Sequence, residues 1–348
     1  MSEFALLVGG KRYTGWKSIS ITDSLEQLAA TFVFDYADRW SYQARPWPIS
    51  AGAQCTVLYG GERVIVGWVD DAPSSYDATD YSQSVAGRSR TGDLVDCSAV
   101  HPGEWVEQRL DQIARDLCKP FGIDVSVACD LGAAFPKFGL EQGETVHEAL
   151  ERAARMRGVR LASTPAGDLL ITRVGARRSS TVIERGVNVL SAVRTWSVGD
   201  RFHRYTVLGQ SQGSDEWSGE AAAQLKAEAT DDGARRARTL VLLAEGQEPN
   251  LDELTKRATW ERNVRAGRAM RLRYRLAGWE SAEGIWRANT LVRVVDSWFG
   301  VDRELVIAGV QFEKNDQGDT TTLELVEPKA LSVEPLPPER QSTEEEWL

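Results

Sequence analysis

Cysteine is scarce in this chain of 348 residues, which contains only four. They are Cys55, Cys97, Cys118 and Cys129, and none belongs to a CxxC pair. This spacing excludes the common zinc motifs and a dense disulfide framework. We therefore expect reduced, buried cysteines that pack as small apolar side chains.

Histidine is scarcer still, with only His101, His147 and His203. No HxH or HExxH spacing is present, so the sequence predicts no metal centre. Phosphate-loop and dinucleotide motifs are also missing, because Gly9-Gly10-Lys11 lacks the surrounding residues of a phosphate loop. We predict that the protein uses no cofactor.

Long apolar runs and a basic surplus are absent as well. No stretch approaches the length of a transmembrane helix, and Met1–Val8 is too short and too acidic for a signal peptide. We expect no membrane insertion and a chain that stays in the cytoplasm unless another machine exports it. The net charge of −10 argues against a general nucleic-acid binder.

The carboxylate pairs Asp70-Asp71 and Asp231-Asp232 are the best candidates for chemistry. Either could supply glycosidase acids or metal ligands. Both adjoin polar loop residues, which favours solvated turns. No nucleophile is accompanied by a base and an orienting group, so we predict no catalytic residue and no enzyme activity.

Short strands separated by Gly-rich turns dominate the first part of the chain. The stretch Ala53–Arg90 predicts strands at Cys55–Tyr59, Val64–Val69 and Tyr81–Gly87. The same order returns over Thr290–Pro328, with Val66-Gly67-Trp68-Val69 aligned to Ala308-Gly309-Val310-Gln311. We interpret the two stretches as copies of one β module.

Between the copies, the apolar period changes from two to 3.6. Trp105–Lys119 is predicted to be a helix that stops at Pro120. Thr145 and Glu148 form a capping box for a second helix, and Gly158 stands at its C-cap position. A hairpin is expected about Pro165-Ala166-Gly167.

The predicted fold is mainly β with an α+β part. Two antiparallel β-barrels of similar build are predicted with an α+β domain between them in the chain, and a helical insertion interrupts the second barrel. The expected ranges are 1–95 and 177–213 with 269–330 for the barrels, 96–176 for the α+β domain, 214–268 for the insertion, and 331–348 for an extended tail.

The insertion and the tail carry the candidate interaction residues. Ser211–Asp232 is predicted to be mobile or loosely helical, and a capping box at Asn250 opens a helix to about Arg268. This helix carries Arg257, Arg262, Arg265 and Arg268, a solvated or intersubunit face. The tail ends in Trp347-Leu348, an apolar pair that suggests docking on a partner.

Several motifs, in their order along residues 10–328, resemble one known family. They are Gly15-Trp16, Val66-Gly67-Trp68-Val69-Asp70, the run Gly87–Asp96, Gly143-Glu144-Thr145 leading into Glu148–Arg152, Arg204–Gln210, Gly278-Trp279, and Gly284-Ile285-Trp286 up to Asn289. The chain is similar to the tail hub proteins of Mu-like contractile-tailed phages, which are related to the N-terminal part of VgrG proteins of type VI secretion.

The resemblance implies a structural baseplate hub, a homotrimer whose six similar barrels form a pseudo-six-fold ring. Such a ring adapts a six-fold tail tube to a three-fold spike and lets DNA pass. The implied partners are further copies of the chain, a central spike, the tail tube or its initiator, baseplate wedge proteins and the tape-measure protein. The implied location is the tail of a virion or tailocin, assembled in the host cytoplasm.

Two other functions compete with this interpretation. The first is a tail-associated glycan hydrolase that uses Asp70 or Asp71. The second is a monomeric two-barrel module that binds carbohydrate or peptide. The family motifs supply no catalytic residues, and the spike-docking role of Trp347 and Leu348 is an extension of the resemblance.

Overall fold

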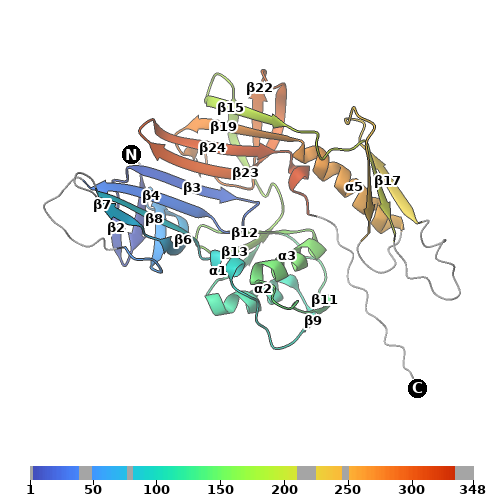
Figure 1. The fold of residues 1–348 in the computed structure, drawn as a ribbon, viewed down its shortest axis with the longest axis horizontal. Helices are drawn as coiled ribbons and strands as arrows, with labels where there is room; N and C mark the ends of the chain where they lie inside the picture. The colour runs from blue at the N-terminus through green and yellow to red at the C-terminus, as the bar shows by residue number, and fades with distance from the viewer. Residues whose placement is uncertain (1–2, 39–48, 77–80, 210–224, 245–250, 334–348) are drawn as a thin grey trace.

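The computed structural model describes residues 3–38, 49–76, 81–209, 225–244 and 251–333 (Figure 1). A 14-stranded sheet forms most of the molecule. The α+β domain lies below this sheet in Figure 1, and a helix with a small sheet projects from its right-hand end. The predicted mainly β class with an α+β part is confirmed.

The N-terminal part of the large sheet, here called the first β unit, pairs in the order β3-β4-β8-β6-β5-β1-β2, with β7 on β8. Its strands are β1 (Phe4–Val8), β2 (Lys11–Tyr13), β3 (Ser18–Ser24), β4 (Thr31–Asp38), β5 (Gln54–Tyr59), β6 (Glu62–Asp71), β7 (Ser74–Tyr76) and β8 (Tyr81–Ser89). The three strands predicted in Ala53–Arg90 are therefore confirmed, with slightly wider bounds.

The C-terminal part, here called the second β unit, pairs in the order β15-β19-β24-β23-β22-β14. Its strands are β14 (Arg177–Glu184), β15 (Val189–Trp196), β19 (Met270–Ala277), β22 (Thr290–Asp296), β23 (Val301–Asn315) and β24 (Gly318–Val326), with the hairpin β20 (Glu280–Ser281) and β21 (Gly284–Ile285) between β19 and β22. This order matches β3-β4-β8-β6-β5-β1, except that β14 runs parallel to β22 whereas β1 runs antiparallel to β5. The internal repeat is confirmed, and it extends beyond the three strands seen in the sequence.

The long strand β23 joins the two units. One of its edges pairs with β22 along Val301–Val306 and then with β3 along Gly309–Lys314. Among the described residues, neither unit closes on itself, so the prediction of two closed barrels is not confirmed. In the second unit the gap lies between β14 and β15, which are consecutive in the chain but stand at opposite ends of the pairing order.

A single apolar core runs through both β units. The Phe4 ring lies 4.6 Å from that of Trp279 and 5.8 Å from that of Phe312, measured between centroids. All three side chains are buried. Aromatic contacts of this kind stabilise beyond the area they bury, so the two units support one another.

The α+β domain follows the first unit and has its own core. Its elements are α1 (Gly92–Asp96), β9 (Trp105–Gln108), α2 (Leu110–Cys118), η1 (Lys119–Phe121), β10 (Val125–Val127), β11 (Phe135–Phe138), α3 (Val146–Arg157), β12 (Arg160–Ser163) and β13 (Leu169–Thr172). Thr145 and Glu148 form the predicted capping box, and Gly158 adopts the left-handed conformation at the C-cap.

The helix predicted to start at Trp105 is wrong in its first turn. Trp105–Gln108 is a strand that pairs with β11. Glu107 has φ 51°, a left-handed conformation through which a right-handed helix cannot continue. The helix begins only at Leu110.

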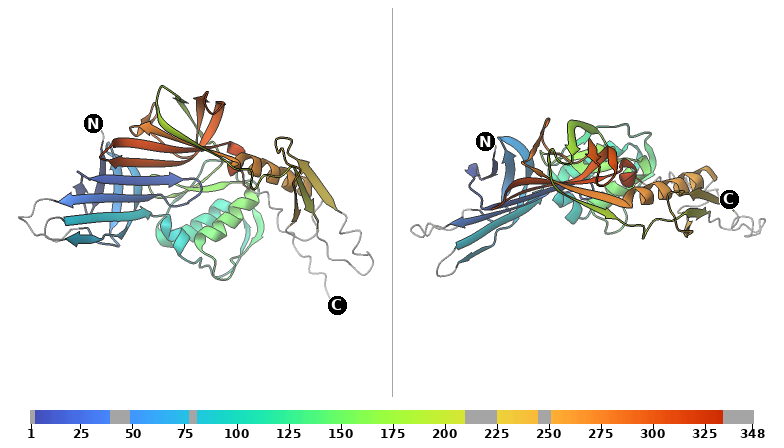
Figure 2. Two further views of the ribbon diagram at one scale, coloured as in Figure 1. Left: turned by 45° about the horizontal axis from the view of Figure 1, so that its top comes forward. Right: turned by 90° about the horizontal axis from the view of Figure 1, so that it is seen from above.

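The inserted segment is not simply helical. β16 (Arg204–Leu208), β17 (Lys226–Thr230) and β18 (Thr239–Leu243) form a small sheet, and α5 (Leu251–Arg268) packs on it. Figure 2 shows this sheet and α5 projecting from one end of the molecule. The prediction of mobile or loosely helical structure is wrong for Lys226–Thr230, because Ala227 and Ala229 alternate inward as in a strand.

Two further predictions are corrected. The predicted second barrel includes Arg204–Leu208, but this strand, β16, pairs with β17 and β18. The tail does not start at Leu331, because η2 (Pro328–Leu331) buries Ala330 and Leu331 against Leu25 and its neighbours. Trp347 and Leu348 lie outside the described residues, as do Asn250 and most of the inserted segment before β17.

Candidate functional site

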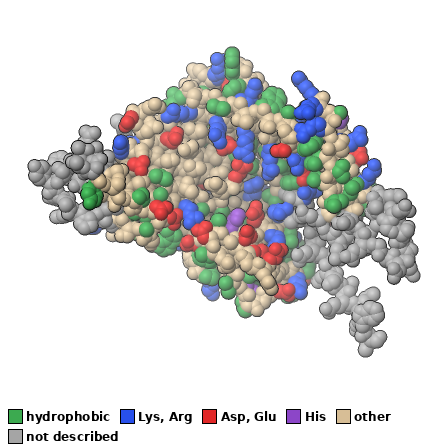
Figure 3. Space-filling view, viewed as in Figure 1, with side chains coloured by type: hydrophobic (Ala, Val, Ile, Leu, Met, Phe, Trp, Pro, Cys, Tyr) green, Lys and Arg blue, Asp and Glu red, His purple; other side chains and the backbone are tan. Residues whose placement is uncertain are grey.

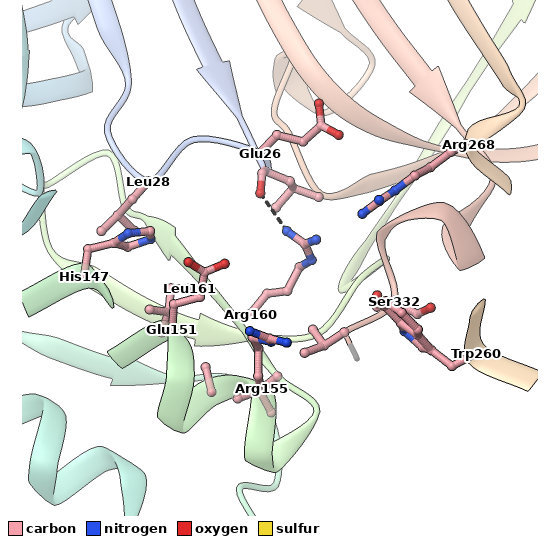
Figure 4. Close-up of a pocket in the computed structure, with 14 residues that line it drawn as sticks. Glu26, Leu28, His147, Glu151, Arg155, Arg160, Leu161, Trp260, Arg268 and Ser332 are labelled. Atoms are coloured by element: carbon pink, nitrogen blue, oxygen red, sulfur yellow. Dashed lines mark hydrogen bonds between the residues drawn. The ribbon is translucent and has the colours of Figure 1, made fainter. Parts of the chain in front are cut away.

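A cavity of about 280 Å³ lies where five parts of the chain meet (Figure 4). The turn after β3, the helix α3, the strand β12 and the helix α5 each supply part of its wall. Ser332 and Val333, which follow η2, supply the rest. The cavity therefore lies at the joint between the large sheet, the α+β domain and the projecting helix.

Arg160 is the central side chain of this joint. Its Nη1 donates to the Leu25 carbonyl oxygen at 2.8 Å, and its Nε donates to the Leu331 carbonyl oxygen at 2.8 Å. Burial lowers the pKa of Arg160, while Glu26 and Glu151 act in the opposite direction. The guanidinium thus links β12 to two segments that lie far from it in sequence.

Two side chains of α5 hold the same C-terminal segment. Arg268 Nε donates to the Ala330 carbonyl oxygen at 3.3 Å, and Trp260 Nε1 donates to the Ser332 carbonyl oxygen at 3.2 Å. Gly267 permits this close approach, because a Cβ there would lie 2.7 Å from the Ala330 nitrogen. The joint fixes the direction in which the chain leaves η2.

Two carboxylates beside this joint are held by Arg271. Arg271 forms a 2.5 Å ion pair with Glu26 and a 2.6 Å ion pair with Glu324. Hydrogen bonding from Arg271 lowers the pKa of Glu26. A carboxylate held ionised in this way is not a general acid at neutral pH, so the arrangement serves structure.

The predicted arginine face of α5 is partly engaged within the chain. Arg257 and Arg265 lie on either side of the buried Glu261, at 3.0 and 2.7 Å. Arg262 donates to Asn263, and Arg268 is used at the joint. Figure 3 shows basic side chains gathered over α5, the small sheet and the region of β19.

One member of each carboxylate pair is also engaged. Asp70 accepts from Arg88 at 2.8 Å, and Arg88 also pairs with Asp96 at 2.6 Å. Asp231 accepts two bonds from Arg201, which lowers its pKa. Asp231 is only 8% exposed, so the interpretation of a solvated turn is wrong at this position.

The histidines are dispersed over the molecule. His101 stacks on Trp105 at 3.9 Å, His203 lies beside the Asp231 carbonyl oxygen, and His147 lies in the wall of the cavity. Within the described ranges, no three His, Cys, Asp or Glu side chains are grouped as they would be around a metal ion.

The cysteines agree with the sequence prediction only in part. Cys55 and Cys118 are buried free thiols, and burial raises the pKa of each to about 12. Cys97 is exposed, contrary to the prediction. None of the described helices has the length and apolar character needed to cross a membrane.

Sequence reasoning missed the joint around Arg160. Its one signal is an arginine in the short strand that follows the C-cap Gly158. Its partners, Leu25 and Leu331, lie 135 and 171 residues away in the sequence. No local pattern could have indicated them.

The chain matches three family models. They are "Mu phage baseplate assembly protein GpP-like, N-terminal" at residues 3–89, "Baseplate hub protein gp44-like, second domain" at 91–173, and "Mu phage baseplate assembly protein GpP, fourth domain" at 251–334. Baseplate hub protein gp44 of Escherichia phage Mu is 31% identical over 351 residues, which span 97% of this chain and 90% of that protein. This chain belongs to the baseplate hub proteins of Mu-like phages.

Solved structures agree with this family of baseplate hub proteins. The 43 kDa tail protein of prophage MuSo2 from Shewanella oneidensis is 38% identical, with a TM-score of 0.86 over 95% of this chain and 99% of that one. An Escherichia coli component of the type VI secretion system shares the fold with a TM-score of 0.56 at 9% identity, over 96% of this chain and 80% of that one. That component is described as structurally similar to the T4 bacteriophage tail proteins gp27 and gp5. The predicted resemblance to tail hub and secretion proteins is confirmed.

Proposed function

We propose that three copies of this chain form a closed ring at the centre of the baseplate. The observation that carries the proposal is the pairing of two β units of the same strand order through β3 and β23. Each copy then contributes two similar units side by side, so that three copies present six. A ring of this kind has three-fold symmetry in its sequence and approximate six-fold symmetry in its backbone.

Such a ring would match a six-fold tail tube on one face and a three-fold spike on the other. The partners that follow are the central spike, the tail tube or its initiator, the baseplate wedge proteins and the tape-measure protein. Each β unit acts in this proposal as one open barrel of the ring. The location that follows is the tail baseplate of a virion, with assembly in the host cytoplasm.

DNA passes through the ring in this proposal and is not bound. The net charge of −10 supports passage, because binding to DNA depends on phosphate contacts with a basic surface. No catalytic residue or cofactor forms part of the proposal.

We retain the domain boundaries at residues 95 and 176 as part of the proposal. The family models break near these two positions, at 89–91 and 173. Docking of the spike on Trp347 and Leu348, and an intersubunit role for Arg257, Arg262, Arg265 and Arg268, also belong to the proposal.

Light scattering of the purified chain at micromolar concentration, alone and with its spike, tests the ring. We expect a mass of three chains, and particle images with three-fold or pseudo-six-fold rings. A monomer under both conditions would contradict the proposal. Muralytic activity that is lost in Asp70→Asn or Asp71→Asn would instead establish the hydrolase alternative.

A further inference from the structure

We propose that β15 of one copy adds to the edge of the segment Asp70–Ser75 that faces away from β8 in the next copy. This intersubunit strand pairing rests on the proposed ring and names the surfaces that close it. The occupant of each edge is a second copy of this chain.

The template for this contact is present within the chain. β3 pairs antiparallel with Gly309–Lys314 on the edge of β23, beyond the point where β22 ends. In the matching strand order of the two units, β15 corresponds to β3, and β6 corresponds to β23. A ring of six similar units would repeat this contact between copies, so that β15 takes the place of β3 and the end of β6 takes the place of the end of β23.

The strand edge that is added, here called the donor edge, is available on β15. β15 pairs with β19 on one side, and the described residues provide no strand on its other side. Ser197 N donates to the Ala269 carbonyl oxygen, so by alternation the amides of Arg194 and Trp196 point to the open edge. Leu190, Val193 and Trp196 are 59, 59 and 61% exposed, which is unusual for apolar side chains on one strand.

The strand edge that receives β15, here called the acceptor edge, is available on β6 beyond Trp68. β6 pairs with β5 as far as Trp68, and Val69 still exchanges hydrogen bonds with Gly52 and Ala53. From Asp70 to Ser75, the strand pairings within the described residues run to β8 on the other edge. This stretch corresponds to the part of β23 that β3 occupies.

The charges beside the two edges are complementary. Arg273 on β19 is 64% exposed, and its nearest carboxylate, on Glu324, is 3.8 Å away. Asp71 is exposed at the end of β6 and forms no ion pair within the described residues. Strand addition would bring this cation and anion into one surface, which favours the correct partner over a like-charged one.

The two edges do not meet within one chain. β7, just beyond the end of β6, lies at the left of Figure 1, while β15 lies at its top. The pairing order separates β15 from β6 by six intervening strands. The contact is therefore head-to-tail between copies, the type of interface that generates a ring when its rotation closes.

The substitution Val193→Lys tests the donor edge in the full-length chain. A lysine on an edge strand opposes strand addition. Val241→Lys is the matched control, because Val241 is a 56% exposed valine on β18, an edge strand of the small sheet. We expect Val193→Lys to raise the concentration at which the trimer dissociates by about tenfold or more, and Val241→Lys to leave it unchanged.

Engineered cysteines provide a second measurement, in a background with the exposed Cys97 replaced by serine. Val193→Cys combined with Ser74→Cys or Ser75→Cys should give covalent trimers on oxidation. Each single variant, and the pair Val241→Cys with Ser75→Cys, should not. A wild-type trimer that survives Val193→Lys and yields no cross-link would overturn this inference and leave the ring intact. A wild-type monomer, even with the spike present, would overturn both.

Discussion

Gly67 and Gly309 stand at aligned positions of the repeat, yet their surroundings differ. A Cβ on Gly67 would lie 1.8 Å from the Arg88 carbonyl oxygen, so no other residue fits against β8. At Gly309 the nearest atom would be 3.7 Å away, an ordinary contact. Gly309 instead follows a bulge in the β23–β24 ladder, between Ile307 and Gly309. Close strand packing explains Gly67 only.

The substitution Gly67→Ala should therefore destabilise the protein much more than Gly309→Ala. We expect a loss of about 3 kcal/mol for the first, the upper end of overpacking effects, and less than about 1 kcal/mol for the second. Urea denaturation followed by circular dichroism measures both. An equally small loss of unfolding free energy in both variants would show that the backbone around Gly67 relaxes at little cost.

Residues with local partners were predictable, and residues with distant partners were not. Thr145 and Glu148 cap α3 across three residues, and the sequence shows both partners together. Arg160 bonds to carbonyl groups at Leu25 and Leu331, which only the fold brings near. The sequence alignment of the repeat also pairs the buried Val69 with the half-exposed Gln311. These positions are not equivalent, because the bulge follows Val69 in one copy and precedes Gly309 in the other.

At the scale of elements, one ion pair fastens the small sheet. Arg201 donates to both carboxylate oxygens of Asp231, at 2.7 and 2.9 Å, and Asp231 also accepts from the Gly233 amide. The pair thus ties the turn after β17 to the chain that precedes β16. Both side chains are largely buried, with 17% of the Arg201 side chain and 9% of the Asp231 side chain exposed.

The stability from this pair should depend on pH. Hydrogen bonding from Arg201 lowers the pKa of Asp231 below its ordinary value of 3.8, so the stabilisation is complete above that value and is lost as the pH falls through the folded pKa. We expect Asp231→Asn to reduce the local stability of β17 and β18 by about 3 kcal/mol near pH 7. The difference from wild type should shrink below about pH 4.

Hydrogen exchange of the amides in β17 and β18 measures this effect directly. Asp302→Asn is the control, because Asp302 and Arg293 form an ion pair that is about 60% exposed on both sides. Exposed pairs contribute little, so its exchange rates should be unchanged. A pH-independent effect of Asp231→Asn would contradict the electrostatic explanation.

Element types were predicted well where the period was long, and less well in short segments. α3 and the strands of Ala53–Arg90 agree with their patterns. The first turn of the predicted helix at Trp105 fails, because tertiary pairing with β11 and the left-handed Glu107 override its apolar spacing. β17 was missed because its inward residues are alanines, which carry little strand signal.

At the scale of the molecule, the two kinds of core differ in independence. Apart from Leu28, the core of the α+β domain is formed entirely by residues 94–171. The core of the β units is shared, with Phe4 packed on Trp279 and Phe312. The repeat was visible in the sequence, but this sharing was not, because it depends on the pairing of β3 with β23.

Fragments should reveal this difference. Residues 91–173 alone should fold and melt cooperatively, because nearly all of their core is internal. Residues 3–89 alone should lack a cooperative transition, because the edge of β3 is unpaired and Phe4 loses its contacts with Trp279 and Phe312. Circular dichroism melts and amide spectra of the two fragments check both expectations. A cooperative melt of 3–89 would show that the first β unit does not depend on the second.

The pairing of β3 with β23 also sets the order in which the chain can fold during synthesis. About 290 residues separate the paired positions, from Ser24 with Gly309 to Ile19 with Lys314. At bacterial translation rates, the β3 edge waits about 15 to 60 s for its partner to be made. During that time it is an open template for other nascent chains on the same message. Ribosome spacing and chaperone supply in the cell that makes the chain therefore bear on the yield of correctly folded hub.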